Sequence, residues 1–475
     1  MPKLSLVFLC LFVFATLTGC ITAGPEYSPP LLDMPETWNN LTEHGLVHPD
    51  QTDLSQWWQG LGDPLLSSLI DQALASNLDV QSAETRLRQA RARRQVATAD
   101  LFPTLNTSGS VRSSHSSLPG GGMRSRENYA TSLDAGWELD IFGGARRGVE
   151  AAEAEVQASQ ARAHGAQATL AAEVAISYVQ LRTLQERLRI SHDNLVQQSE
   201  TVQLTLWRMQ AGLTDTLAAT QAKAQAEQTR AMIPALETSL KETAHSLDIL
   251  LAKQPGALHD LLDVPGHLPV LPKDVAVGIP ADTLRQRPDL MAAERMLVAE
   301  TARLGVAEAA RYPSFKLSGS IGLDALTFAG LSQTGALASS LVAGITVPLF
   351  QGGRLKAQVD IQDAQRELAL INYEQTVLTA LEEVENALVA LTKTAERTQA
   401  LDQATQAADL AASLAQQRYA SGLVDFQSVL DTQRSLLSTQ DSLASARADH
   451  VLAFIRLYKA LGGGWSTGSD PKTKE

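Results

Sequence analysis

The chain is poor in cysteine and in aromatic residues. Its 475 residues include two cysteines, Cys10 and Cys20, and aromatic side chains make up 5%. Because Cys10 lies in an amino-terminal apolar stretch that is predicted to be removed, the mature chain has no disulfide and no cysteine-based metal site. The low aromatic content, together with many runs rich in Ala and Gln, favours long helices over a dense globular core.

Basic character and catalytic motifs are also lacking. The formal net charge of −13 argues against a protein that binds nucleic acid through a basic face. The sequence has no Walker loop, HExxH motif, nucleophile elbow or dinucleotide-binding fingerprint. His44 and His48 flank Gly45 in a predicted loop, and no third metal ligand accompanies them. We therefore expect neither an enzyme nor a bound cofactor.

The amino terminus, MPKLSLVFLCLFVFATLTGC, has the pattern of an export signal. Lys3 supplies the positive charge, and the apolar stretch 4–17 is too short to favour a membrane span. The stretch ends in LTGC, which resembles the bacterial lipobox, so we expect lipidation at Cys20. In lipoproteins, an uncharged following residue, here Ile21, implies sorting to the outer membrane. The alternative is an ordinary signal peptide in which Cys20 has no role.

Three stretches of the first half return in the second half. They are LFPTLNTSGSV (101–111) and RYPSFKLSGSI (311–321), ELDIFGGARR (138–147) and TVPLFQGGRL (346–355), and RMQAGLTD (208–215) and RYASGLVD (418–425). Offsets of 208 to 210 residues indicate a duplication, because solenoid repeats are much shorter.

The repeat predicts the domain organisation. We expect a signal peptide at 1–19, a lipidated extended segment at 20–62, a first repeat at 63–250, a Pro- and Gly-rich connector at 251–280, a second repeat at 281–461 and a tail at 462–475.

Very long helices are predicted within each repeat. No proline occurs from 145 to 211, and apolar residues recur at every seventh position: Val174, Leu181, Leu188, Leu195 and Val202. The second repeat has the same spacing at Leu370, Val377, Val384 and Leu391. A sevenfold repeat is typical of a coiled-coil seam, so these helices must pack side by side along their length.

The duplicated stretches also predict four strands per chain. Apolar and polar residues alternate along each strand. In the strand predicted from Tyr129 to Ile141, the polar face carries Asp134, Glu138 and Asp140. A strand of about ten residues can cross a bilayer at a tilt. Two soluble hairpins are the alternative, but the export signal and the carboxylates favour a water-filled membrane barrel.

Four strands cannot close a barrel alone, and open edges in lipid leave backbone groups without hydrogen-bond partners. Several copies of the chain must therefore share one barrel. A dimer would have about eight strands, whose interior side chains fill, whereas a trimer would have about twelve and leave a lumen. The polar residues on the inner face favour the trimer.

These features resemble the TolC-like outer membrane efflux proteins, specifically the lipoprotein branch with OprM- and NodT-like members. Four blocks in this order carry the resemblance: WWQGLGDPLLSSLIDQAL (57–74), LRQRPDLMAAERML (284–297), VPLFQGGRLKAQVDIQDAQ (347–365) and RYASGLVDFQSVLDTQRS (418–435). The resemblance implies an α+β membrane channel-tunnel, in which a homotrimer shares a twelve-stranded transmembrane β-barrel that a coiled-coil helical barrel continues.

The resemblance also implies partners and a location. The expected partners are a periplasmic adaptor (membrane fusion) protein, an inner membrane pump of the RND type, and the lipid of the outer membrane. The protein would be lipid-anchored in the outer membrane and extend into the periplasm.

The resemblance implies that two pairs of turn residues contact the adaptor. They are Gly212 and Leu213 in the first repeat, and Gly422 and Leu423 in the second. A purely structural interpretation is compatible with this role. In it, the glycines end one helix in a left-handed conformation, while Thr214 or Asp215, and Asp425, cap the next helix.

The resemblance further implies a periplasmic gate at Tyr419 and Asp431. In a trimer, three copies of Asp431 would form a carboxylate ring that favours cations. The alternative is a helix-surface pair of Asp431 with Arg434. The chain departs from TolC at Ser428, where TolC has a second acid, so a double acidic ring is in doubt.

The predicted function is the outer membrane channel of a tripartite efflux system, a passive conduit for drugs or other small molecules from an inner membrane pump to the exterior. Two alternatives stay open: the outer membrane channel of a protein secretion system, and a non-conducting structural lipoprotein that spans the periplasm. In the channel, the energy must come from a partner, because the sequence has no nucleotide-binding motif.

Overall fold

The computed structural model describes residues 22–31, 35–40, 46–47, 54–117, 120–121, 123–272, 275–276 and 284–466. The predicted signal peptide, Cys20, His44 and His48 therefore lie outside the described residues. The described residues fall into two compact units. The strand unit lies within Met1–Leu31, Arg86–Gln160 and Ala292–Glu374, and the helical unit within Leu32–Thr85, Ala161–Met291 and Gln375–Glu475.

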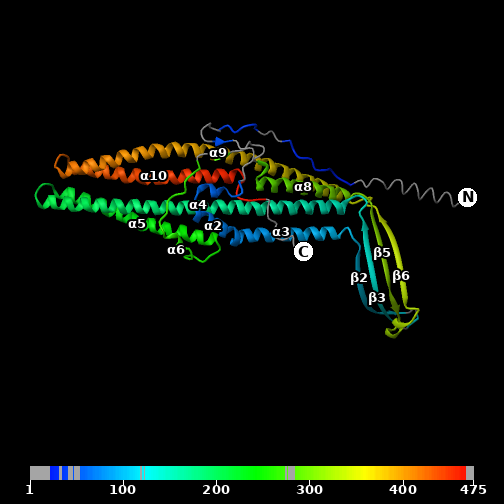
Figure 1. The fold of residues 1–475 in the computed structure, drawn as a ribbon. Coiled ribbons are helices and arrows are strands. Elements are labelled where there is room, and N and C mark those ends of the chain that lie inside the picture. The colour runs from blue at the N-terminus through cyan, green and yellow to red at the C-terminus, as the bar shows by residue number, and fades with distance from the viewer. Residues whose placement is uncertain are drawn as a thin grey trace. The chain divides into compact units, whose positions relative to one another are not determined.

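The duplication is visible in the helices (Figure 1). Three helices of the first repeat match three of the second in length: α3 (Leu78–Ala99) and α8 (Pro288–Ala309) have 22 residues, α4 (Gly144–Gln210) and α9 (Arg354–Ala420) have 67, and α5 (Thr216–Leu250) and α10 (Phe426–Ala460) have 35. In each pair the second helix begins 210 residues after the first, as 144 and 354 illustrate. The shorter elements are η1 (Trp57–Leu61), α2 (Pro64–Ser76), α6 (His259–Leu262), η2 (Phe328–Ser332), and the paired β1 (Leu46–Val47) and β4 (Val275–Ala276).

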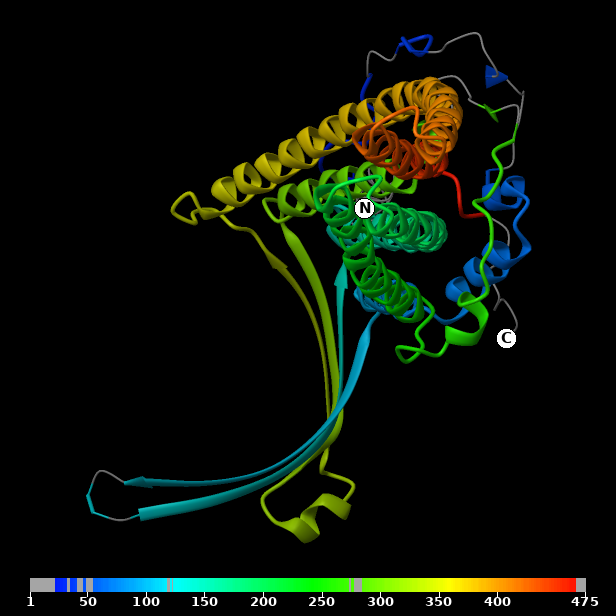
Figure 2. The ribbon, with the colours of Figure 1, turned by 90° about the vertical axis from the view of Figure 1, so that its left-hand side faces the viewer.

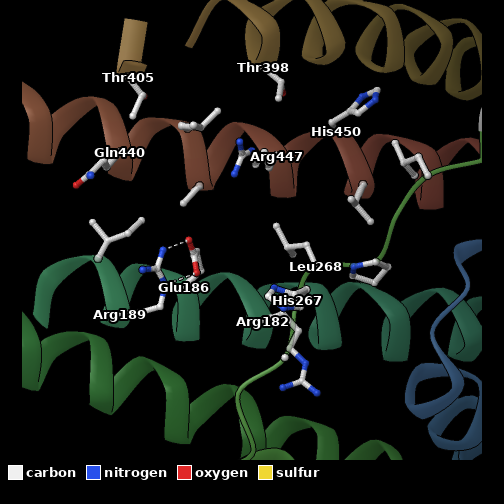
Figure 3. Close-up of a pocket in the computed structure, with 17 residues that line it drawn as sticks. Arg182, Glu186, Arg189, His267, Leu268, Thr398, Thr405, Gln440, Arg447 and His450 are labelled. Carbon is white, nitrogen blue, oxygen red and sulfur yellow. Dashed lines mark hydrogen bonds and ion pairs between the residues drawn. The ribbon is translucent and has the colours of Figure 1, made fainter. Parts of the chain in front are cut away.

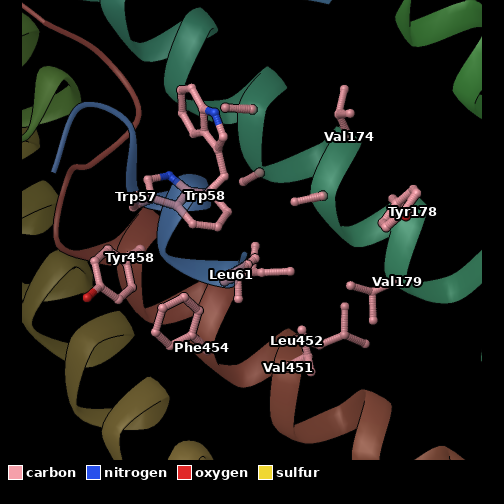
Figure 4. Close-up of a cluster of buried hydrophobic side chains, with 14 of the residues drawn as sticks. Trp57, Trp58, Leu61, Val174, Tyr178, Val179, Val451, Leu452, Phe454 and Tyr458 are labelled. Atoms are coloured by element: carbon pink, nitrogen blue, oxygen red, sulfur yellow. The ribbon is translucent and has the colours of Figure 1, made fainter. Parts of the chain in front are cut away.

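The core of the helical unit is built around the Trp57–Trp58 block (Figure 4). The two indole rings meet edge to face at 5.8 Å, and they lie among Tyr178, Phe454 and other apolar residues of α4 and α10. The Tyr178 hydroxyl donates to the Asp63 carboxylate at 2.7 Å, and burial and this hydrogen bond raise the pKa of Tyr178 to about 12. The WWQGLGDP block is therefore part of the core.

The predicted sevenfold seam is only partly correct. Val174, Leu181, Val377, Val384 and Leu391 are buried, but Leu188, Leu195, Val202 and Leu370 are only half-buried. Towards the end of α4, polar side chains take the fully buried positions: Ser191, Asn194, Gln198, Thr201 and Thr205. These buried positions are also three and four residues apart, as in a heptad. Asn194 and Thr201 each lie one residue before the predicted apolar positions 195 and 202, so the buried face of α4 is rotated by about one residue from the predicted face.

The strand unit contains one antiparallel sheet in the order β2-β3-β5-β6 (Figures 1 and 2). Its strands are β2 (Thr104–Ser117), β3 (Met123–Leu139), β5 (Ser314–Ala325) and β6 (Leu337–Thr346). Even-numbered residues of all four strands share one face, where Ser108 contacts Asp134 at 3.2 Å and Lys316 contacts Glu138 at 3.3 Å. Odd-numbered residues make the other face, which is mainly apolar between Leu139 and Tyr129.

The hairpin of β2 and β3 is longer than the sequence predicted. The alternation indicated a strand from Tyr129, but β3 begins at Met123. Residues 123–128 are polar on both faces except at Met123, so they lack the apolar alternation by which a half-buried strand is identified.

An extended amino-terminal strap lies within the strand unit at residues 22–31. The Ala23 backbone N–H donates to the Phe142 carbonyl at 2.9 Å, and the buried Arg147 donates to the Ala23 carbonyl at 3.2 Å. Further along, the Tyr27 hydroxyl donates to Glu294 at 3.1 Å on α8. The two hydrogen bonds of Ala23 attach the strap to residues 142 and 147 of the strand unit. Among the described residues, no helix has the length and apolar character that crossing a membrane requires.

Candidate functional site: the helix turns and the gate residues

The two long-helix turns have the same backbone geometry. Gly212 and Gly422 adopt left-handed φ angles of 71° and 76°. The next N–H in each turn, of Leu213 or Leu423, donates back to the carbonyl of Arg208 or Arg418 at 2.8 and 2.9 Å. This is the six-to-one bond of a Schellman motif, which a glycine makes without steric cost. The predicted helix-ending role of both glycines is confirmed.

Aspartates cap the helices that follow. The Asp215 carboxylate accepts from the Ala218 N–H at 3.0 Å, and Asp425 accepts from the Ser428 N–H at 3.1 Å. Of the two predicted caps for α5, Asp215 is the one observed. The Ser428 hydroxyl also donates to Asp425 at 2.7 Å. The hydrogen bonds from the hydroxyl and the backbone N–H of Ser428 hold the pKa of Asp425 below its usual range. Rigid caps leave Leu213 and Leu423 exposed at the turns, by 67% and 74%.

Arg208 joins the two turns through Tyr419. One guanidinium nitrogen of Arg208 donates to the carbonyls of Tyr419 and Ala420 at 2.8 and 3.1 Å, where α9 ends. Its guanidinium also lies over the Tyr419 ring, 4.6 Å from the centroid. A cation at this position interacts favourably with the free carbonyls at a helix carboxyl terminus. We call this arrangement the Arg208 clasp.

Tyr419 is therefore buried within its own chain. It is 3% exposed and packs edge to face on Phe426 at 5.6 Å, together with Ala218, Ala222, Val429 and Leu430. Within the described residues, its hydroxyl has no hydrogen-bond partner. A predicted gate residue thus acts, in the single chain, as the packing surface between the two turns.

Asp431 lies exposed on α10. Its carboxylate accepts from the Gln427 side chain at 2.8 Å. The alternative pair with Arg434 is wrong, because Arg434 donates instead to Gln225 on α5 at 2.7 Å. Within the described residues, neither Tyr419 nor Arg434 forms a hydrogen bond or ion pair with the exposed Asp431 carboxylate.

The helices next to these turns meet through a polar seam. Gln433 of α10 donates to Thr201 of α4 at 3.0 Å, and Asn194 donates to Gln440 at 2.7 Å. The buried Gln198 side chain has no hydrogen-bond partner within the described residues. Polar seams with incomplete hydrogen bonding separate at a lower free-energy cost than apolar ones, because water satisfies the groups that become exposed.

A cavity of about 530 Å³ lies elsewhere in the helical unit (Figure 3). It is lined by α4, α9, α10 and residues 266–271, and its charged groups already bind their neighbours. Arg189 pairs with Glu186 at 2.7 Å, and Arg447 pairs with Asp402 at 2.8 Å. Burial lowers the pKa of His450, which contacts Thr394 at 3.0 Å. Among the described residues, no group of three His, Cys, Asp or Glu side chains could hold a metal ion.

Sequence reasoning missed Arg208. The signal was present, because an arginine stands four residues before the glycine in both RMQAG and RYASG. Which of the two arginines reaches the other turn depends on packing. Arg418 makes no side-chain hydrogen bond or ion pair within the described part of the chain.

Comparison with known proteins agrees with this architecture. The Outer membrane efflux protein family matches twice, at residues 69–253 and 279–463. Nodulation protein T of Rhizobium leguminosarum bv. trifolii is 33% identical over 96% of this chain and 97% of its own length. Outer membrane protein OprJ of Pseudomonas aeruginosa is 30% identical over 96% of each chain. The solved outer-membrane channel OprN superposes with a TM-score of 0.89 at 35% identity, over 93% of this chain and 99% of its own.

The fold that the sequence predicted, that of a TolC-like channel-tunnel with an internal tandem repeat, is confirmed by these matches. Two further relatives are named as outer membrane proteins of efflux pumps, the matching solved structure is an outer-membrane channel, and neither the family nor the fold is that of an enzyme. The chain therefore belongs to the outer membrane efflux protein family, and it is the outer membrane channel of an efflux system.

Proposed function

We propose that three copies of the chain form one channel, which passively conducts small molecules that an inner membrane pump delivers. The single observation that carries this proposal is the four-stranded sheet with one apolar and one polar face. Within that sheet, β2 and β6 each have one long edge without a partner strand. In lipid such edges must pair, and three copies make a closed barrel of about twelve strands with a lumen.

The pump and the adaptor follow from the relatives. Two similar proteins of Pseudomonas putida are named as outer membrane proteins of a toluene efflux pump and of a solvent efflux pump. We propose that this chain likewise works with a periplasmic adaptor and a pump of the RND type. The exposed Leu213 and Leu423, held in place by Gly212 and Gly422, are the proposed contacts for the adaptor.

The gate is proposed to lie where the two turns meet. Three exposed Asp431 carboxylates around the axis would attract cations and repel one another. Tyr419 would hold the second turn against the first through the Arg208 clasp. The polar seam between α4 and α10 would let the helix pairs separate when an adaptor docks.

Lipidation at Cys20 is proposed as the anchor. The strap begins at residue 22 and is bonded to Phe142 through Ala23. Three residues of extended chain reach about 10 Å, so a lipid on Cys20 would enter the membrane close to the junction of β3 and α4.

The experiment that tests this function is single-channel recording of the purified, lipidated protein in planar bilayers, with its mass in detergent measured alongside. We expect a trimer with a small, cation-selective and mostly closed conductance. Replacing Asp431 by Ala removes the carboxylate ring, and we expect about a tenfold higher open probability and weaker cation preference. A monomer without conductance would instead favour the structural lipoprotein. A conducting trimer that the Asp431→Ala change leaves unaltered would contradict only the gate.

A further inference from the structure

The outer part of the β2–β3 hairpin projects beyond the rest of the sheet. β5 pairs with β3 from Leu139 only as far as Tyr129. Beyond that point, residues 123–128 of β3 pair with residues 112–117 of β2 alone. Figure 2 shows this two-stranded part continuing past the end of β5 and β6. We call it the outer ribbon.

Aromatic side chains mark both edges of the apolar band on the odd-numbered face. At one edge Phe142 stacks on Tyr312 at 4.7 Å, and at the other Tyr129 meets Phe328 edge to face at 6.0 Å. The 11 residues of β3 that pair with β5 separate the two edges. This matches the length of a membrane-crossing strand and the aromatic girdles that flank it. The outer ribbon therefore begins where the membrane band ends.

The charge of the even-numbered face changes sign at that edge. Within the band this face carries three carboxylates and one cation: Asp134, bonded to Ser132 and Ser108, Asp324, bonded to Asn128, and Glu138, which pairs with Lys316. In the outer ribbon the same face carries Arg112, Arg124 and Arg126. Ser114 pairs with Arg126 and Ser116 pairs with Arg124, so all three arginines occupy even-numbered positions of the two strands. Diagonal and next-but-one positions in a sheet are about 7 Å apart, so Arg126 is a near neighbour of both Arg112 and Arg124 along the sheet, and the three arginines form one cluster.

No carboxylate of residues 112–117 and 123–128 lies on the arginine face. The one acid of these residues, Glu127, is on the opposite face, where it accepts from the Tyr129 hydroxyl at 3.0 Å. All three arginines are exposed, and within the described residues none of their side chains has an ion-pair partner. The guanidinium group stays charged at every relevant pH. The cluster is thus a fixed positive site in a chain whose net charge is −13.

We propose that Arg112, Arg124 and Arg126 form an anion-binding collar at the outer mouth of the channel, selective for solutes with phosphate or carboxylate groups. The inference rests on the proposed trimeric channel, in which three copies of the cluster surround one opening. A ring of arginines attracts anions and holds phosphate groups in bidentate fashion. The collar would favour the exit of anionic cargo and oppose the entry of cations from outside.

The face on which the arginines lie decides between cargo and membrane lipid. They continue the polar face, which lines the lumen, whereas lipid contacts the apolar face. The continuation of the apolar face carries no arginine or lysine; it has Ser113, Glu127 and His115, whose ring contacts Ser125 at 3.4 Å. The pore-side ligand is therefore favoured over phosphorylated lipid headgroups.

The test uses sodium tripolyphosphate as a blocker of the single-channel current, added to each side of the bilayer in turn. We expect block of the native channel from the ribbon side only. The triple variant Arg112→Gln, Arg124→Gln, Arg126→Gln should need at least about ten times more tripolyphosphate for half block, since three charged contacts are lost. The difference should shrink as the KCl concentration rises.

Two matched variants control for charge and for folding. The triple Arg→Lys variant keeps the charge and should retain most of the block, while Glu127→Gln changes the charge of the opposite face and should leave the block unchanged. Equal block of the native and triple Gln channels would overturn the collar alone. Equal block together with lost binding to lipopolysaccharide vesicles would assign the arginines to lipid instead. Absence of current in every protein would overturn the proposed channel and the collar with it.

Discussion

The two repeats agree in their helices and differ in their strands. Each of the three long helix pairs keeps its length and its offset of 210 residues, whereas β2 and β3 have 14 and 17 residues against 12 and 10 for β5 and β6. Helices that pack along their whole length cannot change length without shifting every contact beyond the change. A hairpin can grow at its tip without disturbing the rest of the sheet, and the outer ribbon has grown in this way.

Within the helices, the repeats fill one equivalent position with different chemistry. Asn77 donates to the Leu250 carbonyl at 2.9 Å at the end of α5, and Arg287 donates to the Ala460 carbonyl at 2.7 Å at the end of α10. Both side chains are buried. Arg287 additionally pairs with Asp289 and Glu383, both at 2.7 Å. The same helix end is therefore closed by a neutral amide in one repeat and by an ion-pair network in the other.

The turns differ in the same way. Arg208 and Arg418 occupy equivalent positions, but only Arg208 caps the opposite helix and covers Tyr419. The duplicated backbone thus carries an asymmetric set of side-chain links. Three substitutions test whether these links, and not the shared backbone, set stability and gating.

The largest effect on stability is expected from Arg287→Ala. The change leaves the Ala460 carbonyl and two half-exposed carboxylates without their donor, at a cost of about 2 to 3 kcal/mol in the free energy of unfolding. Denaturation of the detergent-solubilised protein at pH 7 measures this. A loss no greater than that of an exposed arginine variant, such as Arg418→Ala, would contradict the assigned network.

The same substitution predicts a pH dependence. Burial opposes ionisation of Asp289, but the hydrogen bonds and charge of Arg287 outweigh it and hold the pKa of this carboxyl below its usual range. The stabilisation is therefore complete above the ordinary carboxyl pKa of about 4 and is lost as the pH falls through the lowered value. The gap between native and variant proteins should narrow below pH of about 4.

An effect of intermediate size, on channel gating, is expected from Arg208→Ala. It removes two charged hydrogen bonds and a cation–π contact, together about 1 to 2 kcal/mol. If that free energy holds the turns closed, the open probability in planar bilayers should rise about tenfold. Arg418→Ala, the equivalent change in the other repeat, should have no effect. If Arg208→Ala and Arg418→Ala raise the open probability equally, the Arg208 clasp has no specific role in gating.

The smallest effect is expected from Asn77→Ala. The Asn77 side chain also accepts from the backbone N–H of Asp79 at 2.8 Å, so its loss should cost about 1 kcal/mol. Because an amide does not titrate, this loss should be the same at pH 8 and well below a pH of about 4, where the Asp289 carboxyl becomes protonated. The comparison with Arg287→Ala at both pH values separates a neutral cap from an ion-pair cap; parallel pH profiles would refute that distinction.

Much of the fold followed from local sequence patterns. The duplication, the proline-free 67-residue helices, the alternating strands, the left-handed Gly212 and Gly422 and the cap at Asp425 all depend on nearby residues. Such features are set by backbone sterics and by spacing, which a sequence displays directly. The gate and adaptor residues remain predictions, because their roles depend on partner chains.

Tertiary structure alone decided which side chains meet. The apolar heptad through Leu195 and Val202 pointed to one helix phase, but packing rotated α4 so that Gln198 and Thr201 are buried instead. Likewise Asp431 binds Gln427, not Arg434, since Arg434 reaches α5. A helix offers several overlapping stripes of residues three and four apart, and only the neighbouring helix selects one of them. The sequence by itself therefore determined the elements and their duplication, and packing between distant segments determined the Arg208 clasp and the polar seam.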